Sequence, residues 1–113
     1  LAVLLASAAC AVDWKALKPQ GYVSDFAGVV DAGSKAQLER YCGMVERSTG
    51  AQIALVTIRS LEGEPIEDVA NTIFRAWGVG QKGKNEGLLL LLAIRDHRSR
   101  IRTPAKYVRP NTS

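Results

Sequence analysis

The first regular pattern along the chain is that of a helix that packs with one side. In residues 34–48, apolar side chains recur three or four positions apart, which is the spacing of one face of an α-helix. Ser34 and Gln37 form a capping box at its start, and Gly50 supplies a left-handed stop after it. The pattern therefore predicts a helix over 34–48. Its apolar stripe consists of Leu38, Tyr41, Cys42 and Val45.

A second helix is predicted after the polar loop 60–64. Pro65 suits the first turn of a helix, and the acidic side chains Glu67 and Asp68 stand near its positive end. Gly78 ends it. The apolar stripe of this helix consists of Ile66, Val69, Ile73 and Trp77, with Ala70 and Phe74 beside them.

The two most apolar runs, 52–58 and 88–94, show no polar alternation, which is typical of strands covered on both faces. Composition alone would allow a helix over the leucine run 88–94, but its short length between a glycine-rich loop and a charged turn favours a strand. The order strand, helix, strand over 52–94 predicts a right-handed crossover between parallel strands. With a short extended piece from Tyr22 and a return strand over 99–103, the pattern predicts an α/β domain whose helices cover a small sheet.

The chain begins with an uncharged apolar segment. Residues 1–11 are apolar or small, too few to span a bilayer, and they end in a small-x-small cleavage pattern. We therefore expect a partial signal peptide and an exported protein, followed by a linker over 12–21. A buried N-terminal strand or helix is the alternative interpretation. A lipid-anchored Cys10 is disfavoured because Ser7 stands where such signals carry an aliphatic residue.

Charge is unevenly distributed over the 113 residues, a length that suits one domain. Residues 1–81 carry seven Lys or Arg and nine Asp or Glu, whereas residues 82–113 carry eight and two. This asymmetry argues against a uniformly basic nucleic-acid-binding domain; polyanion binding by the arginine-rich end stays a minor alternative. Since His97 is the only histidine and no Cys or His pair has metal-ligand spacing, a zinc site is excluded.

Candidate chemistry is concentrated in a few polar positions near strand ends. Asp25 follows the first extended segment, Arg75 projects from the second helix, and Asp96 lies in the turn after the leucine run. The loop 78–87 combines four glycines, two lysines and one carboxylate, so its backbone amides and ammonium groups suit an anion. We expect these features to converge at the carboxyl ends of the strands. The loop is not a P-loop, because Asn85 follows Gly83 and Lys84.

The oxygen-bearing side chains in this set suit a hard divalent cation. Asp25, Asn85, Glu86 and Asp96 offer the oxygen donors that calcium or magnesium takes, and a bound cation would receive phosphate. Structural alternatives stay open at each position. In place of a site role, Asp25 could cap the local backbone, Arg75 could be a solvated residue on the helix surface, and the loop 78–87 could be a solvated connection.

Four stretches of the chain resemble the TPM-domain family: residues 21–30, 49–56, 70–80 and 82–90. The resemblance implies an α/β/α sandwich on the outer side of a membrane, with an envelope membrane protein as a partner. Some family members are acid phosphatases and some bind calcium. By resemblance, Asp25 and Glu86 fall at site carboxylates, and Arg75 falls on an Arg-x-Trp-Gly motif.

The resemblance ends abruptly after Ile101. Arg102 replaces a site acid, Pro104 replaces a glycine, and the helices that follow in the family do not appear. We therefore expect a TPM-like domain over 22–103 that is incomplete at its C-terminus, followed by a divergent basic tail over 104–113. Missing elements would leave the leucine strand partly uncovered, which favours self-association.

Two functions follow as expectations. The first is a calcium-dependent, phosphatase-like hydrolase in which Asp25 and Arg75 are catalytic, with either a carboxylate or a water as the attacking group. The second is a non-catalytic envelope module that binds calcium or a partner. Nucleic acid is not expected as a partner, and no membrane-spanning helix is expected in this chain.

Overall fold

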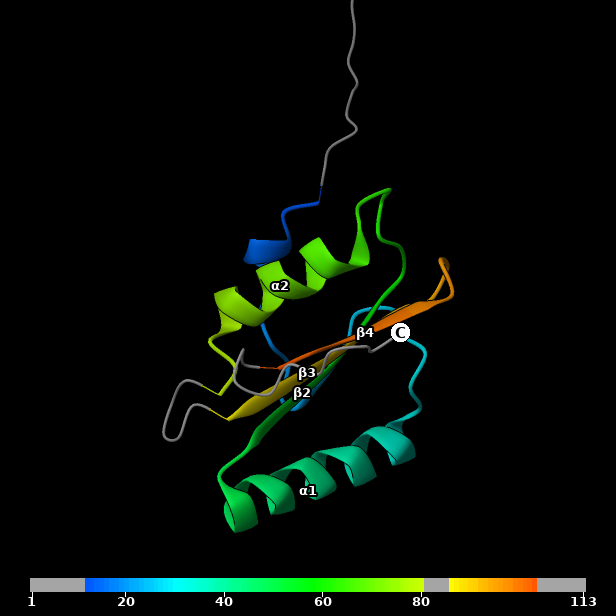
Figure 1. Ribbon diagram of the computed structural model, residues 1–113. Helices are drawn as coiled ribbons and strands as arrows, with labels where there is room; N and C mark the ends of the chain where they lie inside the picture. The colour runs from blue at the N-terminus through cyan, green and yellow to red at the C-terminus, as the bar shows by residue number, and fades with distance from the viewer. Residues whose placement is uncertain (1–11, 81–85, 104–113) are drawn as a thin grey trace, which may run out of the picture.

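The computed structural model describes residues 12–80 and 86–103, which form a four-stranded mixed sheet with one helix on each face (Figure 1). The strand order is β1-β2-β3-β4; the first three strands are parallel and β4 pairs antiparallel with β3. This confirms the predicted α/β sandwich with a small mixed sheet. In chain order the elements are η1 (Trp14–Ala16), β1 (Val23–Asp25), α1 (Ala32–Thr49), β2 (Gln52–Ile58), α2 (Ile66–Trp77), β3 (Gly87–Ala93) and β4 (Arg98–Arg102).

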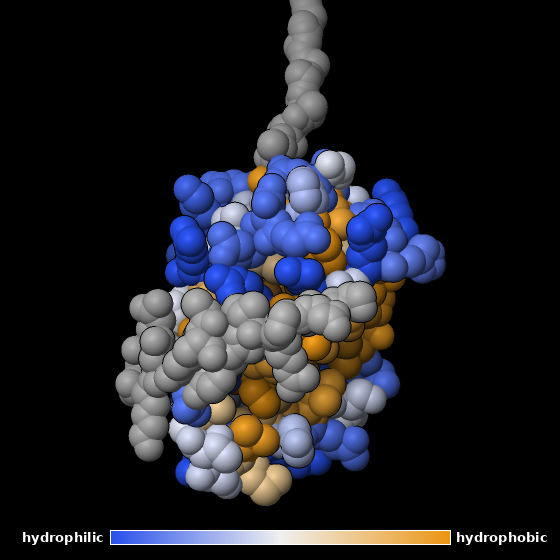
Figure 2. All heavy atoms as spheres, viewed as in Figure 1, coloured by the Kyte–Doolittle hydropathy of each residue, from blue (hydrophilic) through white to orange (hydrophobic). Residues whose placement is uncertain are grey.

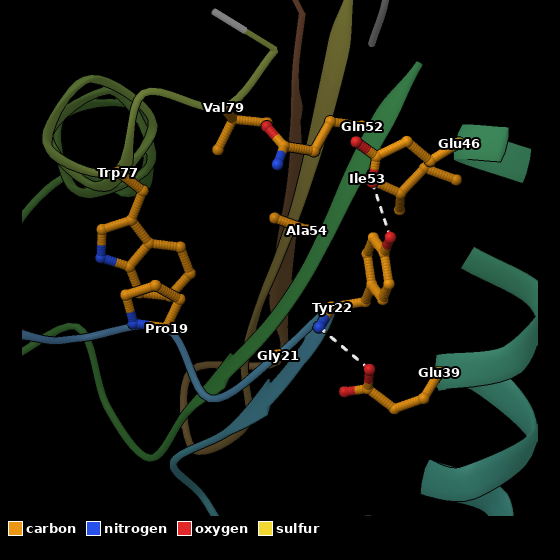
Figure 3. A pocket seen from close by; sticks show the side chains of 10 residues that line it. All are labelled: Pro19, Gly21, Tyr22, Glu39, Glu46, Gln52, Ile53, Ala54, Trp77 and Val79. Atoms are coloured by element: carbon orange, nitrogen blue, oxygen red, sulfur yellow. Dashed lines mark hydrogen bonds between the residues drawn. The ribbon is translucent and has the colours of Figure 1, made fainter. Parts of the chain in front are cut away.

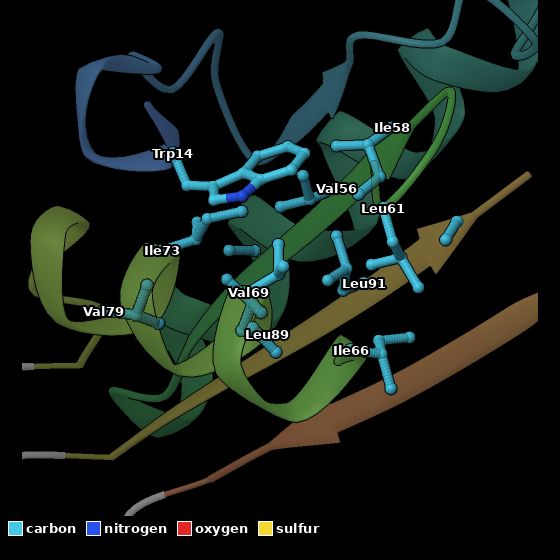
Figure 4. Packing of buried hydrophobic residues seen from close by; sticks show 13 residues of the cluster. Trp14, Val56, Ile58, Leu61, Ile66, Val69, Ile73, Val79, Leu89 and Leu91 are labelled. Carbon is cyan, nitrogen blue, oxygen red and sulfur yellow. The ribbon is translucent and has the colours of Figure 1, made fainter. Parts of the chain in front are cut away.

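The core lies between α2 and the sheet (Figure 4). Alternate residues of β2 and β3 point to this face. The two strands pair in the register Leu55–Leu90, so residues at the same level of both strands point to the same face. The predicted stripe of α2 meets them: Val69 and Ile73 are fully buried. The sheet contributes Ala54, Val56, Ile58, Leu89, Leu91 and Ala93 to this core.

The opposite face of the sheet is only partly covered. Among the described residues, α1 packs against β1 and β2 but not against β3. Leu92 is therefore 36% exposed and Ile101, on β4, is 58% exposed, and Figure 2 shows hydrophobic side chains at the surface between the two helical layers. The prediction that the leucine strand is covered on both faces is wrong for this side. The expected uncovered apolar surface is confirmed.

The two crossover connections have opposite hands. Both step in the same direction along the sheet, from β1 to β2 and from β2 to β3. Two crossovers of one hand would place α1 and α2 on the same face, yet the helices lie on opposite faces (Figure 1). One connection therefore departs from the usual right-handed rule. The parallel pairing predicted for the strands within 52–94 is confirmed.

The start of α1 differs from the prediction. The helix begins at Ala32, because the Asp31 side chain accepts a hydrogen bond from the Ser34 amide at 2.8 Å and acts as the N-cap. Ser34 is thus inside the first turn, and its hydroxyl donates to Asp31 instead of capping the helix. The predicted stop is confirmed, since Gly50 has a φ of 84°.

The segment expected as a linker takes part in the fold. Trp14 in η1 is 8% exposed and belongs to the core beneath α2, and the Trp77 indole donates to the Leu17 carbonyl at 2.9 Å. A large aromatic ring contributes much apolar burial, which explains why this segment packs instead of hanging free. The predicted signal segment 1–11 and the basic tail 104–113 lie outside the described residues. Within the described part, no helix has the length and apolar character needed to cross a bilayer.

Candidate functional site

Asp25 ends β1 and holds the loop that follows it. Its Oδ1 accepts hydrogen bonds from the Thr57 hydroxyl at 2.6 Å and from the Val29 amide at 3.1 Å, and its Oδ2 accepts from the Val30 amide at 2.9 Å. Thr57 lies opposite Asp25 on β2, and its Oγ1 accepts from the Ala27 amide at 3.1 Å. The carboxylate is therefore a backbone cap, which is the structural alternative at this position.

These contacts also determine the charge state of Asp25. Burial raises the pKa of its carboxyl, but the hydrogen bonds from Thr57, Val30 and Val29 outweigh this effect and hold the pKa below its ordinary value of 3.8. The group is half-buried, so one side of it still meets solvent. Asp25 is consequently a fixed, ionised carboxylate at the carboxyl end of a parallel strand, the end at which open α/β sheets bind ligands.

Asp96 lies at the same edge as Asp25 but does not join it. Its Oδ2 accepts a hydrogen bond from the Leu61 amide at 2.9 Å, which fastens the loop between β2 and α2 to the β3–β4 turn. Two strand spacings, about 10 Å, separate β1 from β3. Each of the two carboxylates thus serves its own loop.

Arg75 and the described ends of the loop 78–87 lie at the other end of the sheet. The loop precedes β3, and its last residue, Gly87, pairs with Gln52 at the start of β2, whereas Asp25 pairs with Thr57 near the end of that strand. Six residues of strand, about 20 Å, therefore separate Glu86 from Asp25. Arg75 is exposed near the end of α2, which runs back toward this amino edge. The prediction that all these features converge at the carboxyl edge is wrong, and Asn85 lies outside the described residues.

Two glycines at the base of this loop, Gly80 and Gly87, are required by a close approach of the backbone. Gly80 has a φ of 78°, and a Cβ on it would lie 2.6 Å from the Gly87 nitrogen. The two backbones touch, so neither position has room for a side chain. The Gln52 Oε1 accepts a hydrogen bond from the Gly80 amide at 2.6 Å and fixes this approach. These contacts close the base of the loop, and the anion binding predicted for the loop stays a prediction.

The donor set does not assemble a calcium site among the described side chains. Calcium takes about six to eight oxygen ligands, commonly from several carboxylates. Within residues 12–80 and 86–103, no group of three or more His, Cys, Asp or Glu is placed to hold a metal ion. Asp25 and Asp96 lie apart at the carboxyl edge, and Glu86, about 20 Å from Asp25 along the strands, is too distant to share an ion with it. Their metal-binding roles, and the catalytic roles of Asp25 and Arg75, stay predictions.

A polar cluster that the sequence interpretation missed joins α1 to the start of β1. The Glu39 carboxylate accepts from the Tyr22 amide at 3.1 Å and from the Val23 amide at 2.9 Å, and the Glu46 carboxylate accepts from the Tyr22 hydroxyl at 2.6 Å. Gly21, with a φ of 146°, brings the chain within reach of Glu39. The sequence did contain one signal for this cluster. Glu39 and Glu46 are seven residues apart, three before and four after Cys42, so they lie on the same side of the helix as Cys42, which faces the sheet.

This cluster forms one wall of a hollow at the amino end of the sheet (Figure 3). Trp77 and Pro19 form the wall on the α2 side, whereas Tyr22 and the two acids form the wall on the α1 side. The hollow has a volume of about 440 Å³, within the range of ligand pockets, about 300–1,000 Å³. It is lined by Pro19, Gly21, Tyr22, Glu39, Glu46, Gln52, Ile53, Ala54, Trp77 and Val79.

Comparison with known proteins identifies the family of this fold. A family model described as the TPM domain matches residues 23–109. The solution NMR structure of the N-terminal domain of a P. gingivalis protein is similar to this chain, with a TM-score of 0.67 and 32% sequence identity over 73% of this chain. The chain spans about half of that structure, 52% of its length. No curated protein matches. The chain therefore belongs to the TPM-domain family.

Proposed function

We propose that this domain is a non-catalytic binding module of a TPM-family protein on the exported side of a membrane. Asp25 carries the proposal, because its two oxygens are committed to Thr57 and to the backbone of the loop after β1. A carboxylate with these contacts holds a loop in place and costs the fold stability when it is removed. The uncharged apolar run at residues 1–11 supports the exported location, and an envelope membrane protein is the proposed partner class.

The test compares turnover with stability. The wild-type protein and Asp25→Asn are assayed with a chromogenic phosphate ester, with and without millimolar calcium, and their melting temperatures are measured in the same buffers. We expect no turnover above background in either protein and a lower melting temperature for Asp25→Asn. Calcium-dependent hydrolysis by the wild type that is absent in a folded Asp25→Asn protein would overturn the proposal.

A calcium-dependent phosphatase is the second candidate, and one observation favours it. The pKa of Asp25 lies below the ordinary 3.8, so its carboxyl group is ionised, and its side chain is half-exposed. A cation or a phosphate ester would approach the carboxylate from its solvent-exposed side. The remaining ligands of a cation there would be backbone carbonyls and water. A ligand held only by the folded protein raises its melting temperature, so a calcium-dependent rise that is lost in Asp25→Asn would support this candidate.

A further inference from the structure

The first feature that points to a ligand is the start of β2, which lines the hollow and has no strand paired with it on the β1 side among the described residues. β1 pairs only with residues Leu55–Thr57 of β2, so on this side the first residues of β2 have no strand partner among the described residues. The Leu55 amide donates to the Tyr22 carbonyl, and Ile53, two residues earlier, presents its backbone to the same side. At Gly21 the chain turns away instead of continuing β1 backward along β2. A strand edge of this kind pairs with an extended peptide.

The second feature is the negative charge beside this edge. Figure 3 shows the Glu39 and Glu46 side chains reaching from α1 toward Tyr22. Neither carboxylate forms an ion pair with a Lys or Arg within the described part of the chain, and their hydrogen bonds leave acceptor capacity on both. The C-terminal end of α1 adds a partial negative charge. Arg47 is a nearby cation, with its Nη1 3.3 Å from the Cβ position of Gly43, and it supplies one positive charge against the two carboxylates.

The titration of Tyr22 agrees with this charge balance. Its hydrogen bond to the Glu46 carboxylate raises the pKa of the phenol above its ordinary value of 10.0, and burial and the charge of Glu46 add to the effect. The opposing influence of Arg47 is smaller. The hydroxyl thus stays a donor, and the space beside it favours positive charge.

The third feature is the pair of aromatic walls. Trp77 and Tyr22 line opposite sides of the hollow, and the hydrogen bond from the Trp77 indole to the Leu17 carbonyl holds its ring in place. The electron-rich faces of aromatic rings attract ammonium and guanidinium groups. Fixed rings also bury the aliphatic part of a long basic side chain without much loss of their own freedom.

We propose that this hollow binds an extended peptide segment carrying a Lys or Arg side chain. The peptide main chain pairs with β2 at Ile53, and its cationic group lies by Glu39 and Glu46, with its stem against the aromatic walls. This inference deepens the proposed binding role by naming the partner chemistry, an exposed basic strand of a protein. The hollow lies at the amino end of the strands, whereas Asp25 lies at their carboxyl end. Failure of the peptide to bind and the outcome of the turnover assay are therefore separate results.

The test uses a blocked hexapeptide of valine with one central arginine, and the same peptide with neutral citrulline in its place. Isothermal titration calorimetry with the full chain is expected to show binding of the arginine peptide and at least about tenfold weaker binding of the citrulline peptide. Glu46→Gln should weaken binding of the arginine peptide by about tenfold. Glu67→Gln, on the exposed side of α2, should leave its affinity unchanged. Circular dichroism confirms that both variants are folded.

A separate set of peptides tests whether the peptide main chain pairs with β2. Methylation of the two valine amides next to the arginine removes donors from the peptide main chain and is expected to weaken binding by at least about tenfold. Arginine amide alone is expected to bind far more weakly than the peptide. The proposal is overturned if neither peptide binds, if the arginine and citrulline peptides bind equally, or if arginine amide binds as tightly as the peptide.

Discussion

The two helical layers of the sandwich bury different kinds of side chain. The layer beneath α2 is apolar, with Val69, Ile73 and Leu91 fully buried. In the layer beneath α1, only Cys42 and Gly43 of the helix are buried, and the acids Glu39 and Glu46 lie among the side chains that face the sheet. The fold is thus held by one layer, and the other keeps polar groups and open space at the amino edge of the sheet.

This difference separates stability from binding. Apolar burial of about 25 cal/mol per Å² makes the α2 layer the main source of folding free energy. Carboxylates placed between a helix and a sheet contribute less to stability, because they exchange water for backbone amides. Their position is useful when a ligand brings the opposite charge. The variants below test whether the two layers differ in this way.

The largest effect is expected from neighbouring leucines on opposite faces of β3. Leu91→Ala removes a side chain with 0% exposure beneath α2 and should cost about 2–5 kcal/mol of unfolding free energy. Leu92→Ala, one residue later on the partly uncovered face, should cost less than about 1 kcal/mol, since Leu92 is already 36% exposed. Urea denaturation measures both. Equal losses would contradict the comparison of the two layers.

The next effect concerns the position at which the chain leaves β1. Gly21→Ala puts a Cβ 2.6 Å from the Glu39 Oε2 at a φ of 146°, so the backbone is strained and the carboxylate must shift from the position in which it accepts from the Tyr22 and Val23 amides. We expect a loss of about 1–3 kcal/mol in thermal denaturation. Gly33→Ala in α1 is the matched control and should stabilise the protein by about 0.5–1 kcal/mol, because a helical glycine is replaced by a better helix former.

The contribution of Asp25 should depend on pH. Asp25→Asn is expected to lower stability at pH 7 by about 1–2 kcal/mol, since it weakens the hydrogen bonds to Thr57 and the loop amides. The folded pKa lies below the ordinary 3.8, so this stabilisation is present above pH 3.8 and is lost as the pH falls through the folded value. Denaturation of both proteins between pH 7 and 2.5 should therefore show their difference shrinking at the acid end. A constant difference would contradict an ionised anchor.

The smallest effect on stability is expected from the uncovered apolar surface. Ile101→Lys changes a side chain that is 58% exposed and should alter the unfolding free energy by less than about 0.5 kcal/mol. The same change should reduce self-association, because it places a charge in the patch formed with Leu92. Sedimentation velocity at several protein concentrations measures this. An unchanged distribution of species would show that the patch does not drive association.

Local patterns were enough for most elements of the fold. The apolar run over 52–58 predicted β2 with its observed bounds. The stripe from Ile66 to Trp77 and the stop at Gly78 predicted α2, with Pro65 as the N-cap instead of a residue of the first turn. Such features depend on neighbours within a few residues, so one sequence contains them. The predicted capping box failed because Asp31, just before it, offered the Ser34 amide a competing acceptor.

The candidate site was less predictable. The prediction that Asp25 and Glu86 meet required knowing which end of the sheet each loop occupies, and a loop before a strand lies at the opposite end from a loop after it. Tyr22 and Gln52 gave no signal of their own, since their roles depend on Glu39, Glu46 and Gly80, distant in the sequence.

The sequence by itself determined the helices, the strands, the parallel pairing over 52–94 and the capacity of Asp25 to cap a loop, because hydrophobic period and turn chemistry are local. Only the tertiary structure decided that α1 lies on the face opposite to α2, that it covers β2 but not β3, and that the polar cluster borders a hollow. Packing decides these features, since the apolar stripe predicted for α1 is weak: Cys42 is buried, but Tyr41 is 58% exposed, so the stripe alone does not fix what the helix covers.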